Sequence, residues 1–107
     1  MKTVCIEKRG SLGGTCLNVG CIPSKALLNS THKLEEAKHE FKNYGIIAKD
    51  VSVDFPALMA YKEKAVKGLT SGIEHLFKKN KVDYVKGLGK FTGENTIEVD
   101  VNGGGKE

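Results

Sequence analysis

Two of the three cysteines in this chain, Cys16 and Cys21, lie five residues apart and are the side chains best suited to chemistry. In a regular α-helix that spacing gives about 7.5 Å of rise and about 140° of rotation, which leaves the Cα atoms about 8–9 Å apart. A disulfide needs Cα atoms within roughly 7 Å of each other. If the two cysteines bond, the helix between them must therefore be distorted. Asn18 and Gly20 tolerate such a distortion, and Pro23 removes a helix hydrogen-bond donor just beyond it.

This spacing suits thiol–disulfide exchange, in which one thiolate attacks a disulfide and a second thiol resolves the mixed disulfide. A disulfide that closes a small, distorted ring is strained and easily reduced, as catalytic and regulatory disulfides are. The unpaired N–H groups and positive dipole at the start of a helix also stabilise a thiolate. Cys16 lies near such a start and Lys25 adds a positive charge nearby, so we expect a lowered thiol pKa at Cys16.

The cysteine types and spacing alone leave other hypotheses open. Intracellular cysteines are usually inert, so the pair could be two buried structural thiols of a non-enzymatic α/β module. It could be half of a metal site, although this spacing without a second pair or a nearby histidine ligand is poor for zinc. It could also be a thiol switch that works without a cofactor.

Composition excludes several classes of protein. The chain has 107 residues, of which 39% are hydrophobic and 28% charged, so it is not a disordered, collagen-like or disulfide-dense protein. No apolar run approaches the roughly 18 residues that span a bilayer. The 17 basic and 13 acidic residues are interleaved, so the net charge of +4 indicates a solvated surface rather than a nucleic-acid site. An odd, low cysteine count favours a reducing compartment.

Hydrophobic periodicity and turn residues predict an α/β or α+β chain with two long helices and a small cluster of strands. The predicted elements are a strand over Thr3–Glu7, a glycine-rich loop over residues 8–14, an irregular helical segment from Thr15, helices over residues 24–41 and 55–80 (the second capped by Asp54), strands over residues 82–86, 90–92 and Thr96–Val101, and a turn or frayed end over residues 102–107. The first strand has no evident parallel neighbour. We therefore expect the chain to begin within a larger domain.

The string GGTCLNVGCIPSK, over residues 13–25, resembles the redox-active disulfide motif of the flavoprotein disulfide reductases. The part CIPSKALL, over residues 21–28, is most similar to the dihydrolipoamide dehydrogenase branch of that family. Residues 3–8, 65–74, 76–82 and 87–90 also resemble this branch, and the resemblance is weakest over residues 33–59. Glutathione reductase and mercuric reductase share the cysteine motif and are the nearest alternatives.

The resemblance implies that residues 1–107 form part of a Rossmann-like FAD-binding domain that carries the redox-active disulfide. The first strand of that domain and its G-x-G-x-x-G fingerprint, expected before Thr3, are absent, as are the NAD-binding and C-terminal interface domains. Gly87 and Gly89 match the fingerprint only in part, because Thr92 occupies the place of the third glycine.

The resemblance also implies roles for particular side chains at the redox centre. The thiol of Cys21 corresponds to the one that lies against the flavin, and the thiol of Cys16 to the one that exchanges with the substrate. Lys25 corresponds to a lysine beside the reactive edge of the flavin; without the resemblance it would be taken for a solvated lysine. No metal is implied.

Further positions correspond to residues that contact FAD. Glu7 matches an acidic residue that hydrogen-bonds the adenosine ribose, and Gly89 matches a glycine whose backbone lies by the adenine. Gly13, Gly14 and Thr15 correspond, with Cys16, to residues along the cofactor. Without the resemblance, Glu7 would be taken for an exposed carboxylate and Gly89 for a turn glycine.

The activity implied for the whole protein is oxidation of dihydrolipoamide to lipoamide, with FAD and with reduction of NAD⁺. The implied partners are the lipoyl domains of 2-oxoacid dehydrogenase or glycine-cleavage complexes. The family is homodimeric, and the branch resembles enzymes of the mitochondrial matrix. We expect no turnover from the 107 residues alone, because the NAD-binding domain is missing.

Overall fold

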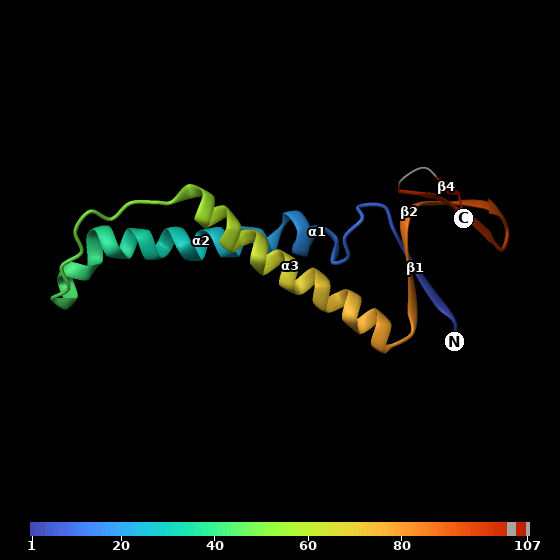
Figure 1. Ribbon diagram of the computed structural model, residues 1–107, viewed down its shortest axis with the longest axis horizontal. Coiled ribbons are helices and arrows are strands. Elements are labelled where there is room, and N and C mark those ends of the chain that lie inside the picture. The colour runs from blue at the N-terminus through green and yellow to red at the C-terminus, as the bar shows by residue number, and fades with distance from the viewer. Residues whose placement is uncertain (103–104, 107) are drawn as a thin grey trace. The chain divides into compact units, whose positions relative to one another are not determined.

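A computed structural model of the chain describes residues 1–102 and 105–106 (Figure 1), and its fold is mixed α/β, as expected. The chain divides into two compact units, one made of residues 1–14 and the described residues from 69 onward, the other of residues 15–68. The elements are β1 (Thr3–Glu7), α1 (Gly14–Val19), α2 (Cys21–Glu35), a π-helix (Glu36–Glu40), a 3-10 helix (Phe41–Tyr44), α3 (Phe55–Lys79), β2 (Val82–Gly93), β3 (Thr96–Val101) and β4 (Gly105–Lys106).

The first unit is built on a sheet with strand order β1-β2-β3-β4. Strand β1 does have a parallel neighbour, since Thr3 lies opposite Val82 and Glu7 opposite Lys86 in β2. The expectation that the first strand lacks such a neighbour is therefore wrong. Its partner lies more than seventy residues further along the chain, beyond all the helices, and a parallel pair needs a crossover of this kind.

Strand β2 is one continuous strand where two were predicted, over residues 82–86 and 90–92. Its first half pairs with β1 and its second half pairs antiparallel with β3, as Figure 1 shows. Gly87 lies at the change of partner. A Cβ there would lie 2.7 Å from Val99 Cγ1 and would also strike the carbonyl oxygen of Asp100. Gly87 thus lies inside a continuous strand and lets β2 and β3 approach closely. It does not form a turn between two strands.

The end of the described chain also differs from expectation. The predicted bounds of β3 are confirmed, but residues 102–107 do not form only a turn or a frayed end, because Gly105 and Lys106 pair with Val101 and Asp100 as β4. Asn102 forms a turn, and residues 103–104 and 107 of that prediction lie outside the described residues.

The core of the first unit lies between the sheet, the loop after β1 and the end of α3. Leu12, in the loop, is 3% exposed and Val99 is 5% exposed. The rings of Phe77 in α3 and Tyr84 in β2 meet edge to face, with centroids 6.2 Å apart. Burial is the main reason that the pKa of Tyr84 is raised. The loop that carries predicted cofactor glycines is thus anchored in this core by Leu12.

In the second unit, helical structure runs from α1 to Tyr44 with one interruption, at Gly20. Helix α2 begins three residues before the predicted start and continues through the π-helix and the 3-10 helix. It ends at Gly45, whose φ of 73° is left-handed. The amide of Ile46 donates to the carbonyl of Phe41 and that of Gly45 to Lys42, which is a Schellman motif.

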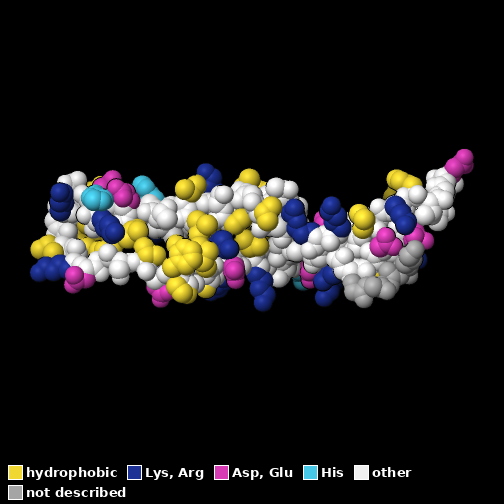
Figure 2. Space-filling view, turned by 90° about the horizontal axis from the view of Figure 1, so that it is seen from above, with side chains coloured by type: hydrophobic (Ala, Val, Ile, Leu, Met, Phe, Trp, Pro, Cys, Tyr) yellow, Lys and Arg dark blue, Asp and Glu magenta, His cyan; other side chains and the backbone are white. Residues whose placement is uncertain are grey.

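Helix α3 is confirmed nearly to the residue. Asp54 caps it as predicted, since the amide of Ala57 donates to Asp54 Oδ1 at 3.1 Å. Lys78 and Lys79 occupy the last turn, where positive charge suits the helix dipole. Within the described residues, no helix combines the length and apolar character needed to cross a bilayer. Figure 2 shows Lys and Arg side chains scattered among acidic ones on the face in view, as the sequence indicated.

Candidate active site

The two cysteines meet at the interruption between α1 and α2. Gly20, with φ −119° and ψ −121°, separates the end of α1 from the start of α2 at Cys21. A Cβ on Gly20 would lie 2.9 Å from the carbonyl oxygen of Thr15 and 3.1 Å from the Cα of Cys16. The backbone around Cys16 therefore passes so close to the start of α2 that only glycine fits. The predicted distortion of the helix between the cysteines is confirmed.

The structure shows the pair as a reduced dithiol. Cys16 and Cys21 are free thiols, and both are exposed. A hydrogen bond joins their side chains. The hypothesis that they are buried, inert thiols is contradicted by this exposure. Two solvent-accessible sulfurs in contact are arranged to form a disulfide by losing two protons and two electrons.

The expected lowering of the Cys16 pKa is wrong for the reduced pair. The hydrogen bond with Cys21 raises the pKa of Cys16 most, and the Cys21 charge adds to the increase. The backbone N–H groups of Cys21 and Ile22, at the start of α2, act in the opposite direction and lower the pKa. The helix start that the sequence indicated is thus present, but the neighbouring thiol outweighs it because it stabilises the protonated form of Cys16.

This balance predicts a pH shift when Cys21 is removed. In Cys21→Ala the two backbone N–H groups remain while the thiol hydrogen bond is lost, so the pKa of Cys16 should fall. A lower pKa means more thiolate at neutral pH. We therefore expect the alkylation of Cys16 by iodoacetamide to begin at a lower pH than in the parent chain, as followed by mass spectrometry. A Cys5→Ala control should leave the Cys16 profile unchanged.

Lys25 lies on α2, exposed, four residues after Cys21. Residues four apart on a helix share a face, so Lys25 and Cys21 are one turn apart on the same side of α2. The predicted role of this lysine beside a flavin stays a prediction.

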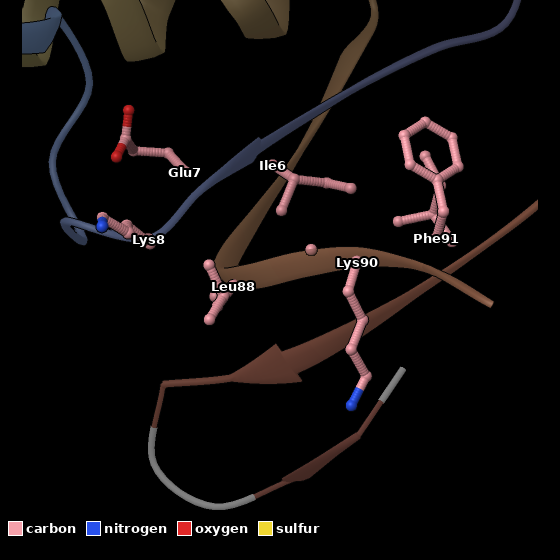
Figure 3. Close-up of a pocket in the computed structure, with 9 residues that line it drawn as sticks. Ile6, Glu7, Lys8, Leu88, Lys90 and Phe91 are labelled. Atoms are coloured by element: carbon pink, nitrogen blue, oxygen red, sulfur yellow. The ribbon is translucent and has the colours of Figure 1, made fainter.

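In the first unit, two other predicted residues come together. Glu7 and Gly89 line one pocket of about 340 Å³ at the end of β1 (Figure 3). Apolar side chains supply much of the remaining wall, from Ile6, Leu88, Phe91 and Ile97. A Cβ on Gly89 would lie 3.3 Å from Ile6 Cδ1. Because glycine has no side chain, the space above its backbone stays part of the pocket. A hydrophobic cavity with one carboxylate at its end suits a flat, apolar ring joined to a group with hydroxyls.

The charges around this pocket are held in place by neighbours. Glu7 Oε1 accepts a hydrogen bond of 2.9 Å from the backbone N–H of Arg9. The Lys90 ammonium lies 3.3 Å from Glu98 Oε1 and 3.9 Å from Asp100 Oδ2 in β3. In Figure 3 the Lys90 side chain accordingly points away from Ile6. Lys8 lines the same pocket, so Glu7 and Lys8 are the charged side chains there besides Lys90, which is paired with β3.

Comparison with known proteins shows the family of this chain. The family model described as pyridine nucleotide-disulphide oxidoreductase matches residues 1–107. The chain belongs to the pyridine nucleotide-disulphide oxidoreductases. Membership implies a flavin cofactor.

This oxidoreductase chain is similar to several curated proteins. It is 65% identical to dihydrolipoyl dehydrogenase 1, mitochondrial, of Arabidopsis thaliana over 98% of this chain and 21% of that protein. It is 64% identical to leghemoglobin reductase of Vigna unguiculata, over 98% and 20%. It is 62% identical to the mitochondrial dihydrolipoyl dehydrogenase of Dictyostelium discoideum, over 97% and 21%. The chain thus spans about a fifth of the length of these relatives.

Two residues, Arg9 and Asn102, make contacts near the candidate site that the sequence does not indicate. Arg9 Nη1 donates to the carbonyl of Gly14 at 3.0 Å, and Asn102 Nδ2 donates to the carbonyl of Lys8 at 3.1 Å. Both contacts hold the loop between β1 and α1. An arginine beside a glycine-rich loop carries no signal of this contact in the sequence, and the contact of Asn102 spans 94 positions.

Within the described residues, no group of three or more His, Cys, Asp and Glu side chains is placed to hold a metal ion. His32 and His39 instead pair with glutamates one turn away, at 3.2 Å from Glu36 and 3.8 Å from Glu35.

Proposed function

We propose that this chain is part of the FAD-binding domain of a dihydrolipoyl dehydrogenase and that Cys16 and Cys21 are its catalytic residues. The observation that carries the proposal is the contact of two exposed thiols across the glycine break between α1 and α2. The family match over residues 1–107 and the identity of 62–65% to named dihydrolipoyl dehydrogenases support the choice of reaction.

The reaction begins with the oxidised pair. A thiolate of dihydrolipoamide attacks the sulfur of Cys16, the Cys16–Cys21 bond breaks, and Cys21 leaves as a thiolate. The second substrate thiol loses its proton and attacks the substrate sulfur of the mixed disulfide. The bond to Cys16 breaks, and Cys16 leaves as a thiolate while the disulfide of lipoamide forms. Dihydrolipoamide has then lost two electrons, and the protein pair has gained them. In the reduced pair the hydrogen bond with Cys21 raises the pKa of Cys16.

Each unit carries residues that, by the resemblance, would hold part of a flavin dinucleotide. The pocket of about 340 Å³ would receive the adenosine half, with Glu7 accepting from ribose hydroxyls and the backbone at Gly89 lying by the adenine. Gly13 and Gly14, with φ of 107° and 62°, and then Thr15 and Cys16 would follow the cofactor. When bound, FAD supplies the two-electron acceptor for the reduced pair, and Lys25 would lie beside its reactive edge.

The wider assignments follow from the relatives and the resemblance. NAD⁺ would be bound by a domain outside these 107 residues. Dihydrolipoamide would be presented on lipoyl domains of 2-oxoacid dehydrogenase or glycine-cleavage complexes, and the whole protein would act as a homodimer. The relatives that are named mitochondrial support a mitochondrial location, and the resemblance implies the matrix.

The test is a visible absorption spectrum of the chain with FAD, before and after dihydrolipoamide is added. A flavin spectrum that stays with the protein through gel filtration, and a long-wavelength band on reduction that Cys21→Ser lacks, would support the proposal. Retained flavin with no response of the thiols to dihydrolipoamide would contradict the reaction. It would favour another flavin disulfide reductase, which glutathione or mercuric ion could then identify.

Glu7→Gln should weaken FAD binding by about tenfold, because an amide replaces a carboxylate as the acceptor for ribose hydroxyls. The amide oxygen can still accept from the backbone N–H of Arg9, so the loop should keep its shape. Affinity is measured by quenching of FAD fluorescence. Glu94→Gln, which removes an equal charge from the exposed turn after β2, is the matched control. Equal affinity of the Glu7 variant and the parent would remove Glu7 from the site.

A further inference from the structure

The segment from the end of β1 to the start of α1 is rich in glycine, the residue that loses the most backbone conformational entropy when it becomes ordered. Gly10, Gly13 and Gly14 all have left-handed φ, at 80°, 107° and 62°. A ligand that bound a mobile loop of this kind would have to supply that entropy, and its affinity would fall accordingly. The loop must therefore be ordered by other contacts if it is to bind tightly.

Arg9 makes two contacts that order the loop from within. Its backbone N–H donates to Glu7 Oε1 at 2.9 Å, and its guanidinium Nη1 donates to the carbonyl of Gly14 at 3.0 Å. The second bond closes a ring over the segment that holds Gly10, Gly13 and Gly14. One residue thus joins the carboxylate at the end of β1 to the carbonyl that precedes Thr15.

Asn102 and Leu12 fix the same loop to the sheet. Asn102 Nδ2 donates to the carbonyl of Lys8 at 3.1 Å, while the Asn102 amide donates to Lys86 in β2 at 2.9 Å. The side chain of Leu12 is 3% exposed. The two ends of the loop are therefore tied, one by Asn102 and one by Arg9, with a hydrophobic anchor between them.

We propose that Arg9 is a positioning residue for the flavin dinucleotide, with Asn102 as its counterpart at the other end of the loop. The guanidinium of Arg9 makes this contribution by ordering residues 10–14 before the cofactor binds. The backbone N–H at position 9, which every variant keeps, holds Glu7. This inference rests on the proposed function for the identity of the ligand. The ordering of the loop by Arg9 does not depend on it.

The experiment uses the 107-residue chain as Arg9→Ala, Arg9→Lys and the parent, with Lys2→Ala as a control that loses the same charge from the exposed end before β1. Titration calorimetry with FAD, and with ADP as a smaller probe, gives affinity and entropy. We expect Arg9→Ala to bind about tenfold more weakly, the size of effect of one charge-assisted hydrogen bond. The loss should appear in the binding entropy, with the melting temperature unchanged. Arg9→Lys, which keeps a donor, should be intermediate.

Hydrogen exchange of the free chain separates this inference from the proposed function. In Arg9→Ala the backbone amides of residues 10–14 should exchange several times faster than in the parent, and those of α3 should not change. Asn102→Ala should accelerate exchange at the same loop. Unchanged loop exchange in Arg9→Ala would overturn the inference even if FAD binds. A different result would overturn the cofactor assignment instead: exchange is faster in Arg9→Ala, but neither the parent chain nor the variant binds FAD or ADP. The loop-ordering role of Arg9 would then still hold.

Discussion

Cys16→Ser is expected to abolish disulfide formation in this chain, and Cys21→Ser is expected to do the same. The parent chain has three free thiols. Mild oxidation with diamide should remove two of them, because the Cys16 and Cys21 side chains already contact each other and only electrons and protons need to leave. In either serine variant no partner sulfur remains. The rate of intramolecular oxidation should therefore fall by roughly 1,000-fold or more, to background, since intramolecular reactions of well-placed groups exceed bimolecular ones by at least that factor.

Thiol titration and peptide mass mapping measure this result, and Cys5→Ser supplies the matched control. Cys5 is partly buried in β1, opposite Tyr84. Its removal should leave the oxidation of the other two thiols unchanged. If Cys16→Ser still lost two thiols by forming a bond between Cys5 and Cys21, the assignment of the redox pair would be wrong. If the parent chain lost none, the contact between the two thiols would have no redox role.

The helix break that brings Cys16 and Cys21 together was predictable because its signal is local. The motif over residues 13–25 places two cysteines, a helix-breaking glycine and a proline within one short segment, and geometry alone demands a break before a disulfide can form. Asp54 and the stripe of α3 are local in the same sense, since a cap and a period of 3.6 need only neighbouring residues. These are the parts of the fold where expectation and structure agree.

The pairing of β1 with β2 was missed because nothing near either strand specifies it. The residues of β1 do not indicate a parallel partner that lies beyond a long crossover. The sequence shows only that both segments favour extended structure. The prediction of two strands, over residues 82–86 and 90–92, where β2 is continuous through Gly87 was wrong for a related reason. A glycine that separates two strands and a glycine that lets two strands approach have the same local appearance, and only the position of Val99 distinguishes them.

The direction of the Cys16 pKa was wrong for an energetic rather than a topological reason. The sequence indicates two effects that favour the thiolate, the helix start and the charge of Lys25, and the backbone N–H groups of Cys21 and Ile22 do lower the pKa of Cys16. The sequence does not show that the thiol of Cys21 is a hydrogen-bond partner, which favours the protonated form more strongly. The helix start and the thiol contact both come from the same break in the helix. Bringing the two cysteines together for exchange thus also raises the pKa of Cys16.

Because the two cysteines meet at the helix break, Gly20→Ala is expected to slow disulfide closure strongly. The new methyl group would lie 2.9 Å from the carbonyl oxygen of Thr15 and 3.1 Å from the Cα of Cys16. Both are backbone atoms, so relief requires α1 to move away from the start of α2 and the two sulfurs to separate. Overpacking of this kind costs about 1–3 kcal/mol. If that cost falls on the geometry in which the thiols meet, disulfide closure should slow by about 10- to 100-fold.

Gly68→Ala is the control that separates a loss of geometry from a general effect of alanine. Gly68 lies within α3, and a Cβ there would meet no atom within 4 Å. Replacing it should stabilise the helix by roughly 0.5–1 kcal/mol, because glycine is a poor helix former, and leave closure by diamide unchanged. Stopped-flow oxidation and thermal melting of both variants give the two quantities. If Gly20→Ala instead closed its disulfide as fast as the parent chain does, the close approach of α1 and α2 at Gly20 would not be what brings Cys16 to Cys21.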